Sequence, residues 1–173
     1  ITHNMKNKKL LLGIAWAWLT CLSANAEVKL PAFFSDGMVM QQQTRANLWG
    51  TATPNAPVKI TTSWDKQTYK TTADAKGAWK LALSTPSAGG PYTITFDDGK
   101  LTEIRDILMG ELWLCSGQSN MEMPMKGFKN QPVENSNTDV MNSRNPQLRL
   151  FTVKRSSSFT PKTDVVGTWQ EAV

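Results

Sequence analysis

The sequence is poor in the residues that ligate metals and form disulfide bonds. It holds one histidine and two cysteines, and they do not cluster with the spacing of a zinc site. The histidine, His3, precedes Met5, which we interpret as the true start of the protein. Cys21 lies in a leader segment, so Cys115 has no partner for an internal disulfide bond and is expected to be a small buried residue. The sequence therefore predicts no metal site.

The first apolar run is too short to cross a membrane. Residues 10–22 give about 13 largely apolar positions, whereas a spanning helix needs roughly 20. Three lysines precede the run, and Ala-Asn-Ala at 24–26 follows it as a cleavage site of small residues. Residues 5–26 are therefore interpreted as a signal peptide that is cleaved after Ala26. This interpretation predicts a secreted or periplasmic protein that is free of the membrane after cleavage.

Little positive charge remains once this leader is removed. The chain has a formal net charge of +5, and subtracting the three leader lysines leaves +2 for residues 27–173. No basic stripe of the kind that follows a phosphate backbone remains. Nucleic acid is therefore not an expected partner.

Residues 27–108 lack the 3.6-residue periodicity of a helix in any window of eleven residues. They alternate apolar and polar side chains instead, and turn residues interrupt them at intervals of about ten residues. Eight short strands are expected, at 28–34, 38–41, 46–50, 58–64, 68–72, 78–83, 92–96 and 101–104. This pattern predicts a β-sandwich domain over 27–108.

Four aromatic residues in this domain admit two interpretations. Trp49, Trp64, Trp79 and Tyr92 could stack on sugars and form the binding face of a carbohydrate module. They could also anchor the core of the sandwich, because large aromatic side chains are mostly buried. The alternation along the strands favours the core.

The second unit, residues 109–173, is interpreted as the start of an α/β domain. The apolar run at 111–116 predicts a buried strand, 134–143 a helix and 147–153 a second strand, with a polar loop at 126–132. Strand, helix and strand over about 40 residues predict a βαβ unit in a parallel sheet. About 65 residues are fewer than such a domain needs, which predicts that it is incomplete. No Gly/Ser-rich linker separates the units, so we expect them to pack together.

A serine after the expected strand at 111–116 could carry chemistry. Ser119 lies at a turn, where Ser and Asn commonly serve as turn or N-cap residues. The alternative is a nucleophile whose own N–H points toward the oxyanion that it creates. Residues 117–121 break the Gly-x-Ser-x-Gly pattern at its last position. Glu122 is a conceivable base, although a carboxylate beside a serine is more often a surface cap.

Residues 110–121, Gly-Glu-Leu-Trp-Leu-Cys-Ser-Gly-Gln-Ser-Asn-Met, resemble the first signature block of the sialate O-acetylesterase family, within the SGNH (GDSL-like) hydrolases. Residues 74–79 and 89–92 also resemble this family, whose N-terminal domain is jelly-roll-like. The resemblance implies that Ser119, and not Ser116, is the nucleophile, with its backbone N–H in the oxyanion hole. Gln118 and Asn120 are candidate substrate contacts.

The resemblance implies an exported carbohydrate esterase that removes O-acetyl groups from sialic acid or a similar acetylated sugar. It acts through an acyl-enzyme and without a cofactor. Family members supply an Asp-x-x-His pair from a later block, and residues 27–173 contain no histidine. The chain is therefore expected to be the N-terminal part of such an enzyme, inactive alone, with a flavodoxin-like α/β hydrolase domain starting at 109. The alternative is a non-catalytic sugar-binding or interaction module built on the sandwich.

Overall fold

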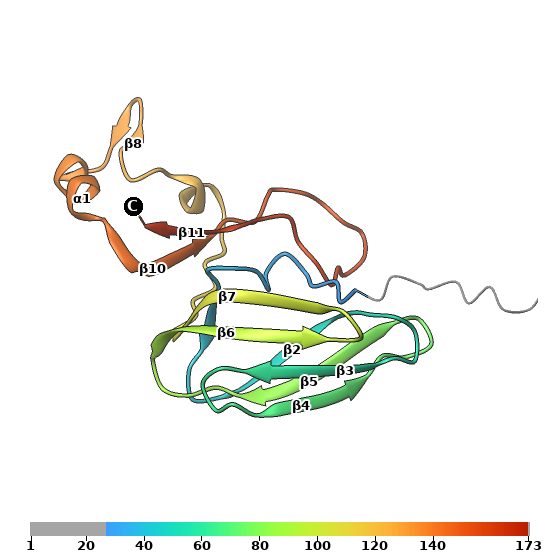
Figure 1. The fold of residues 1–173 in the computed structure, drawn as a ribbon. Helices are drawn as coiled ribbons and strands as arrows, with labels where there is room; N and C mark the ends of the chain where they lie inside the picture. The colour runs from blue at the N-terminus through green and yellow to red at the C-terminus, as the bar shows by residue number, and fades with distance from the viewer. Residues whose placement is uncertain (1–26, 173) are drawn as a thin grey trace, which may run out of the picture.

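The computed structural model describes residues 27–172. The signal peptide interpreted at 5–26, together with His3, lies outside the described residues. The described chain consists mostly of strands, with few helical segments, and a curled mixed sheet is its largest element (Figure 1). Within this part of the chain, no helix is long and apolar enough to cross a membrane.

Seven strands lie in the first part of the described chain. They are β1 (Val39–Gln41), β2 (Arg45–Thr51), β3 (Pro57–Thr62), β4 (Thr68–Thr72), β5 (Ala78–Ser84), β6 (Gly89–Asp97) and β7 (Leu101–Gly110). Alternation explains them, since β3 buries every second side chain and exposes those between. Gly77 permits the tight turn between β4 and β5. Its φ is +85°, and a Cβ there would lie 2.5 Å from the carbonyl oxygen of Ala52.

Five of these strands form one sheet in the order β1-β7-β6-β3-β4. β1 runs parallel to β7 and the other neighbours are antiparallel, so the sheet is mixed. β2 and β5 pair separately as an antiparallel ribbon. The register of β6 on β7 shifts between Tyr92 and Ile94, and opposite this irregularity Asp106 adopts a φ of +55°.

Both sheets contribute side chains to one apolar core. Leu48 and Leu83 come from the β2-β5 ribbon, and Ile60, Ile94 and Phe96 come from the five-stranded sheet. Each of these side chains is at most 1% exposed. Burying one of them stabilises the fold by roughly 1.5–3 kcal/mol, so this shared core holds the two sheets together.

The four aromatic residues belong to the core or pack on it. Trp79 is buried, and its ring centroid lies 5.9 Å from that of Phe96. Trp49, Trp64 and Tyr92 are partly buried and pack against the same core. The core interpretation of these residues is confirmed, and no observation favours an exposed sugar-binding face.

The strand expected at 28–34 is wrong. This segment forms a single bridge, in which Lys29 and Thr51 exchange backbone hydrogen bonds of 2.8 and 2.9 Å. Pro31 has no N–H with which to extend a ladder, and the Phe34 N–H turns back to the Pro31 carbonyl at 2.9 Å. Val28 and Phe34 are nevertheless buried in the core.

Residues 111–172 form only short elements. These are η1 (Ser119–Glu122), β8 (Gly127–Phe128), β9 (Gln131–Pro132), α1 (Ser136–Asn142), β10 (Asn145–Phe151) and β11 (Trp169–Ala172). The helix expected near 134–143 and the strand expected near 147–153 are confirmed as α1 and β10. The expected βαβ unit is wrong, because β10 pairs antiparallel with β11. The polar stretch at 126–132 forms the small β8-β9 hairpin.

The strand expected at 111–116 is also wrong. These residues lie in no strand, and Trp113 and Leu114 are 82% and 94% exposed. Cys115, which was expected to be buried, is exposed as well. A strand of a parallel sheet needs neighbouring strands and cover on both faces, and none of the described strands forms a backbone ladder with this stretch.

The two parts of the described chain, residues 27–110 and 111–172, contact each other directly, and β11 lies beside the segment that precedes β1 (Figure 1). The indole N–H of Trp169 donates to the Phe33 carbonyl at 2.8 Å. The guanidinium of Arg149, in β10, donates to both carboxylate oxygens of Asp106, in β7. These contacts join β10 and β11 to the first sheet.

Candidate active site

Ser119 lies at the start of the short helix η1, in the stretch that follows β7. The Met121 N–H donates to the Gln118 carbonyl at 3.0 Å, and the Met123 N–H donates to the Asn120 carbonyl at 3.4 Å. These two bonds form the turn. Gln118, Ser119 and Asn120 are all exposed, so the turn presents a hydroxyl and two amide side chains to solvent.

The local sequence explains how closely this turn folds back on itself. Gly117 packs directly on the side chain of Met121, and a Cβ at position 117 would lie 2.9 Å from its Cγ atom. Gln118 has φ −106° and ψ −146°, after which the chain enters η1. A glycine before the serine thus lets the helical turn close against the preceding backbone.

The described residues bring no imidazole to Ser119. The single histidine of the chain is His3, which lies outside residues 27–172. Glu122, the other conceivable base, forms an exposed ion pair with Arg155. A serine hydroxyl needs an adjacent base to act as a nucleophile at neutral pH. The roles of Ser119, Gln118 and Asn120 therefore stay predictions.

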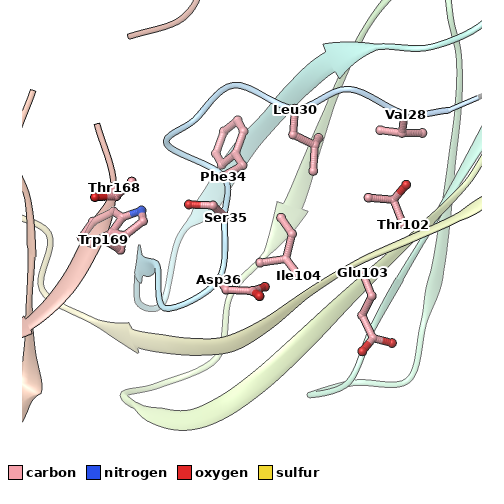
Figure 2. Close-up of a pocket in the computed structure, with 10 residues that line it drawn as sticks. All are labelled: Val28, Leu30, Phe34, Ser35, Asp36, Thr102, Glu103, Ile104, Thr168 and Trp169. Atoms are coloured by element: carbon pink, nitrogen blue, oxygen red, sulfur yellow. The ribbon is translucent and has the colours of Figure 1, made fainter. Parts of the chain in front are cut away.

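A cavity of about 450 Å³ lies between the segment before β1, the strand β7 and β11, and Ser119 does not line it (Figure 2). Phe34 and Ile104 give it apolar walls, and Asp36 and Glu103 add two carboxylates. Asp36 accepts the Arg105 N–H at 2.7 Å, and Glu103 pairs with the Arg105 guanidinium. Both carboxylates are thus engaged by Arg105, which makes them poor candidates for a catalytic base.

Sequence reasoning missed a polar cluster where the chain leaves β7, at the start of the stretch that carries Ser119. Gln41, the last residue of β1, and Gln42, which follows it, both donate hydrogen bonds to the carboxylate of Glu111. The hydrogen bonds from Gln42 and Gln41 lower the pKa of Glu111, against a smaller opposing effect of burial. The one sequence signal was the run of glutamines at 41–43, which begins at the last residue of the strand expected at 38–41.

No protein-family model matches the sequence. A sialate O-acetylesterase of Pongo abelii is 30% identical over 155 residues, which are 84% of this chain and 29% of that protein. The Homo sapiens sialate O-acetylesterase is 32% identical over 131 residues, which are 70% of this chain and 25% of that protein. The crystal structure of a carbohydrate acetylesterase from Xanthomonas citri matches with a TM-score of 0.75 and 34% identity, covering 84% of this chain and 33% of that one.

The strand-rich fold and these matches relate the chain to the carbohydrate acetylesterases, a class of hydrolases. Within that class the chain is related to the sialate O-acetylesterase family, so the family resemblance expected from the sequence is confirmed. The chain spans less than a third of the length of the curated relatives that it matches.

Proposed function

We propose that the chain is part of an exported carbohydrate esterase that removes O-acetyl groups from sialic acid or a similar acetylated sugar. One observation carries the proposal. An exposed serine begins a short helical turn in a chain that is related to sialate O-acetylesterases. The proposed substrate is an acetylated glycan, and the proposed chemistry uses a serine nucleophile without a cofactor.

In the proposed reaction the Oγ atom of Ser119 attacks the carbonyl carbon of the acetyl group, and the hydroxyl proton passes to a base. The Ser119 N–H donates to the oxyanion that forms. The bond to the sugar oxygen then breaks, the sugar oxygen takes the proton, and an acetyl-serine remains. Water hydrolyses this ester, which releases acetate and restores the serine. The base is an imidazole from outside residues 27–172, since this stretch contains no histidine.

The proposal also assigns the parts of the chain. Residues 5–26 are the export signal, 27–108 are a jelly-roll-like β-sandwich, and 109–173 belong to an SGNH hydrolase domain larger than this stretch. The core shared by two sheets supports the sandwich. The exposure of Trp113 and Leu114 supports a larger domain, because contiguous exposed apolar residues usually mark a surface that another part of the protein covers.

A comparison of two serines tests the nucleophile. Ser119→Ala and Ser116→Ala are made in the complete gene product, and turnover of p-nitrophenyl acetate and of an O-acetylated sialic acid is measured. Both serines are exposed in the same stretch, so Ser116→Ala is a matched control. Ser119→Ala is expected to lose on the order of 10⁴-fold or more in kcat, the typical cost of removing a triad member. Ser116→Ala is expected to keep much of the activity.

Residues 27–173 expressed alone are expected to show no measurable turnover on either substrate, because they contain no imidazole. Turnover by this stretch would mean that another group, such as Glu122, acts as the base. A complete protein that keeps its activity after Ser119→Ala would place the nucleophile elsewhere and reduce Ser119 to a turn residue.

A further inference from the structure

The end of β7 is tied to the end of β1 by a small set of polar side chains. Gln41 Nε2 donates to Glu111 Oε2 at 3.1 Å, and Gln42 Nε2 donates to Glu111 Oε1 at 2.8 Å. Each carboxylate oxygen therefore accepts an amide N–H. Hydrogen bonds to an ionised acceptor are stronger than those between neutral groups, and two of them fix the orientation of one carboxylate.

The other ends of the two amides are occupied as well. Gln41 Oε1 accepts the Leu112 N–H at 2.9 Å, and Gln42 Oε1 accepts the Ala88 N–H at 2.7 Å. These bonds decide which end of each amide faces Glu111, because a flipped amide would set oxygen against oxygen. The three side chains of Gln41, Gln42 and Glu111, called the glutamine clamp below, thus have one consistent hydrogen-bond pattern.

The glutamine clamp lies where the chain leaves the sheet toward the serine turn. The Gln42 N–H donates to the carbonyl of Gly110, the last residue of β7, at 2.9 Å. Residues 111–117 then run to η1 without helix or strand. In the described chain, the hydrogen bonds that join this run to the sheet are made at Glu111 and Leu112. The clamp therefore sets the direction in which the run departs.

We propose that the glutamine clamp positions the turn that carries Ser119, with Glu111 as the central positioning residue. The inference rests on the proposed function, in which Ser119 is the nucleophile. A displacement of about 1 Å in a catalytic group can cost on the order of 100-fold in rate. The clamp limits such displacements at the start of residues 111–117, which have no strand partner in the described chain. Because it acts on the nucleophile through the backbone, it affects kcat more than KM.

A reciprocal exchange of two side chains in the complete gene product tests the clamp. Gln42→Glu sets two carboxylates against each other, and Glu111→Gln sets two amide N–H groups against each other. Each change is expected to lower kcat about 10-fold. The double variant restores the pattern, because the new carboxylate at position 42 accepts from the Ala88 N–H and from the new amide at position 111. Its kcat is expected to return to within about threefold of the wild-type value.

The neighbouring glutamine provides the matched control. Gln43 is exposed, and Gln43→Glu adds the same charge one position further along the chain. The kcat and KM of Gln43→Glu are expected to stay close to the wild-type values. The unfolding midpoints of Gln42→Glu, Glu111→Gln, the double variant and Gln43→Glu are also expected to stay close to that of the wild type. A general loss of structure would move the midpoints and would not be reversed by the double exchange.

Two outcomes would overturn the positioning role of the clamp and leave the proposed function standing, provided that Ser119→Ala is inactive. One is a wild-type kcat in both single variants. The other is a loss that the double variant does not reverse, or that appears equally in Gln43→Glu. Activity that survives Ser119→Ala would refute the proposed function and this inference together. The two kinds of failure can be told apart, because the first is measured on Ser119→Ala and the second on the variants at positions 42 and 111.

Discussion

Removing the ion pair between Arg149 and Asp106 is expected to weaken the junction between the two parts of the described chain. Arg149 Nη1 lies 2.7 Å from Asp106 Oδ2, and Nη2 lies 3.3 Å from Asp106 Oδ1. The Arg149 side chain is 8% exposed and the Asp106 side chain is 45% exposed. Glu171 Oε1 lies 3.4 Å from the same Nη2. The cation is therefore buried, while the carboxylates reach water.

The expected magnitude follows from this mixed burial. Breaking a fully buried pair costs about 3–5 kcal/mol, whereas an exposed pair contributes about 0–1 kcal/mol. A half-buried pair lies between these limits, so we expect a coupling free energy of about 2 kcal/mol. Asp106→Asn removes the charge at nearly constant shape, and Asn tolerates the φ of +55° at this position. Arg149→Met removes the cation and keeps an apolar stem.

The assay is a double-mutant cycle of urea unfolding, followed by tryptophan fluorescence, on Asp106→Asn, Arg149→Met and the double variant. Lys59 and Asp97 provide a control cycle, since they lie 3.5 Å apart with side chains 54% and 34% exposed. The control coupling is expected to be below about 0.5 kcal/mol. A coupling for Arg149 and Asp106 as small as the control value would refute the reasoning.

Two further predictions concern the carboxyl group of Asp65 and the N-terminal leader. Burial raises the pKa of Asp65, but hydrogen bonds from Thr62, the Gln67 N–H and Tyr69 outweigh it and lower the pKa below its ordinary value. A lowered folded-state pKa stabilises the fold above the unfolded pKa of about 3.9, and this stabilisation is lost as the pH falls through the folded-state pKa. Tyr69→Phe is expected to raise the Asp65 pKa, and a carboxyl titration by NMR that shows no change would contradict this. Exported protein is expected to begin at Glu27 by mass spectrometry, and a retained leader or a lipid on the chain would contradict the signal peptide.

Local alternation was enough to predict most of the strands. The ranges expected at 58–64 and 78–83 overlap β3 and β5, whose side chains alternate or nearly alternate between core and solvent. The prediction failed at 28–34 and 111–116, which are apolar but have no continuous ladder in the described chain. Apolar composition indicates that a segment can be buried in a strand, but backbone partners decide whether the strand forms.

The candidate site was only partly predictable for the same reason. A contiguous motif identifies Ser119 and its neighbours, and the structure places them together on one exposed turn. The glutamine clamp carries no such signature, because its hydrogen bonds join residues separated by 70 and 69 positions. Nothing in the local sequence of either segment indicates its partner.

By itself, the sequence determined the strand-rich first part, its turns and the relation to the sialate O-acetylesterases. These features depend on alternation over a few residues, on glycine at tight turns and on twelve contiguous residues at 110–121. Only the tertiary structure decided which strands pair. β1 joins β7 in parallel, and β10 pairs with β11 rather than with a parallel strand at 111–116. The physical reason is that backbone N–H and C=O groups are the same in every strand, so the choice of partner depends on how distant segments pack.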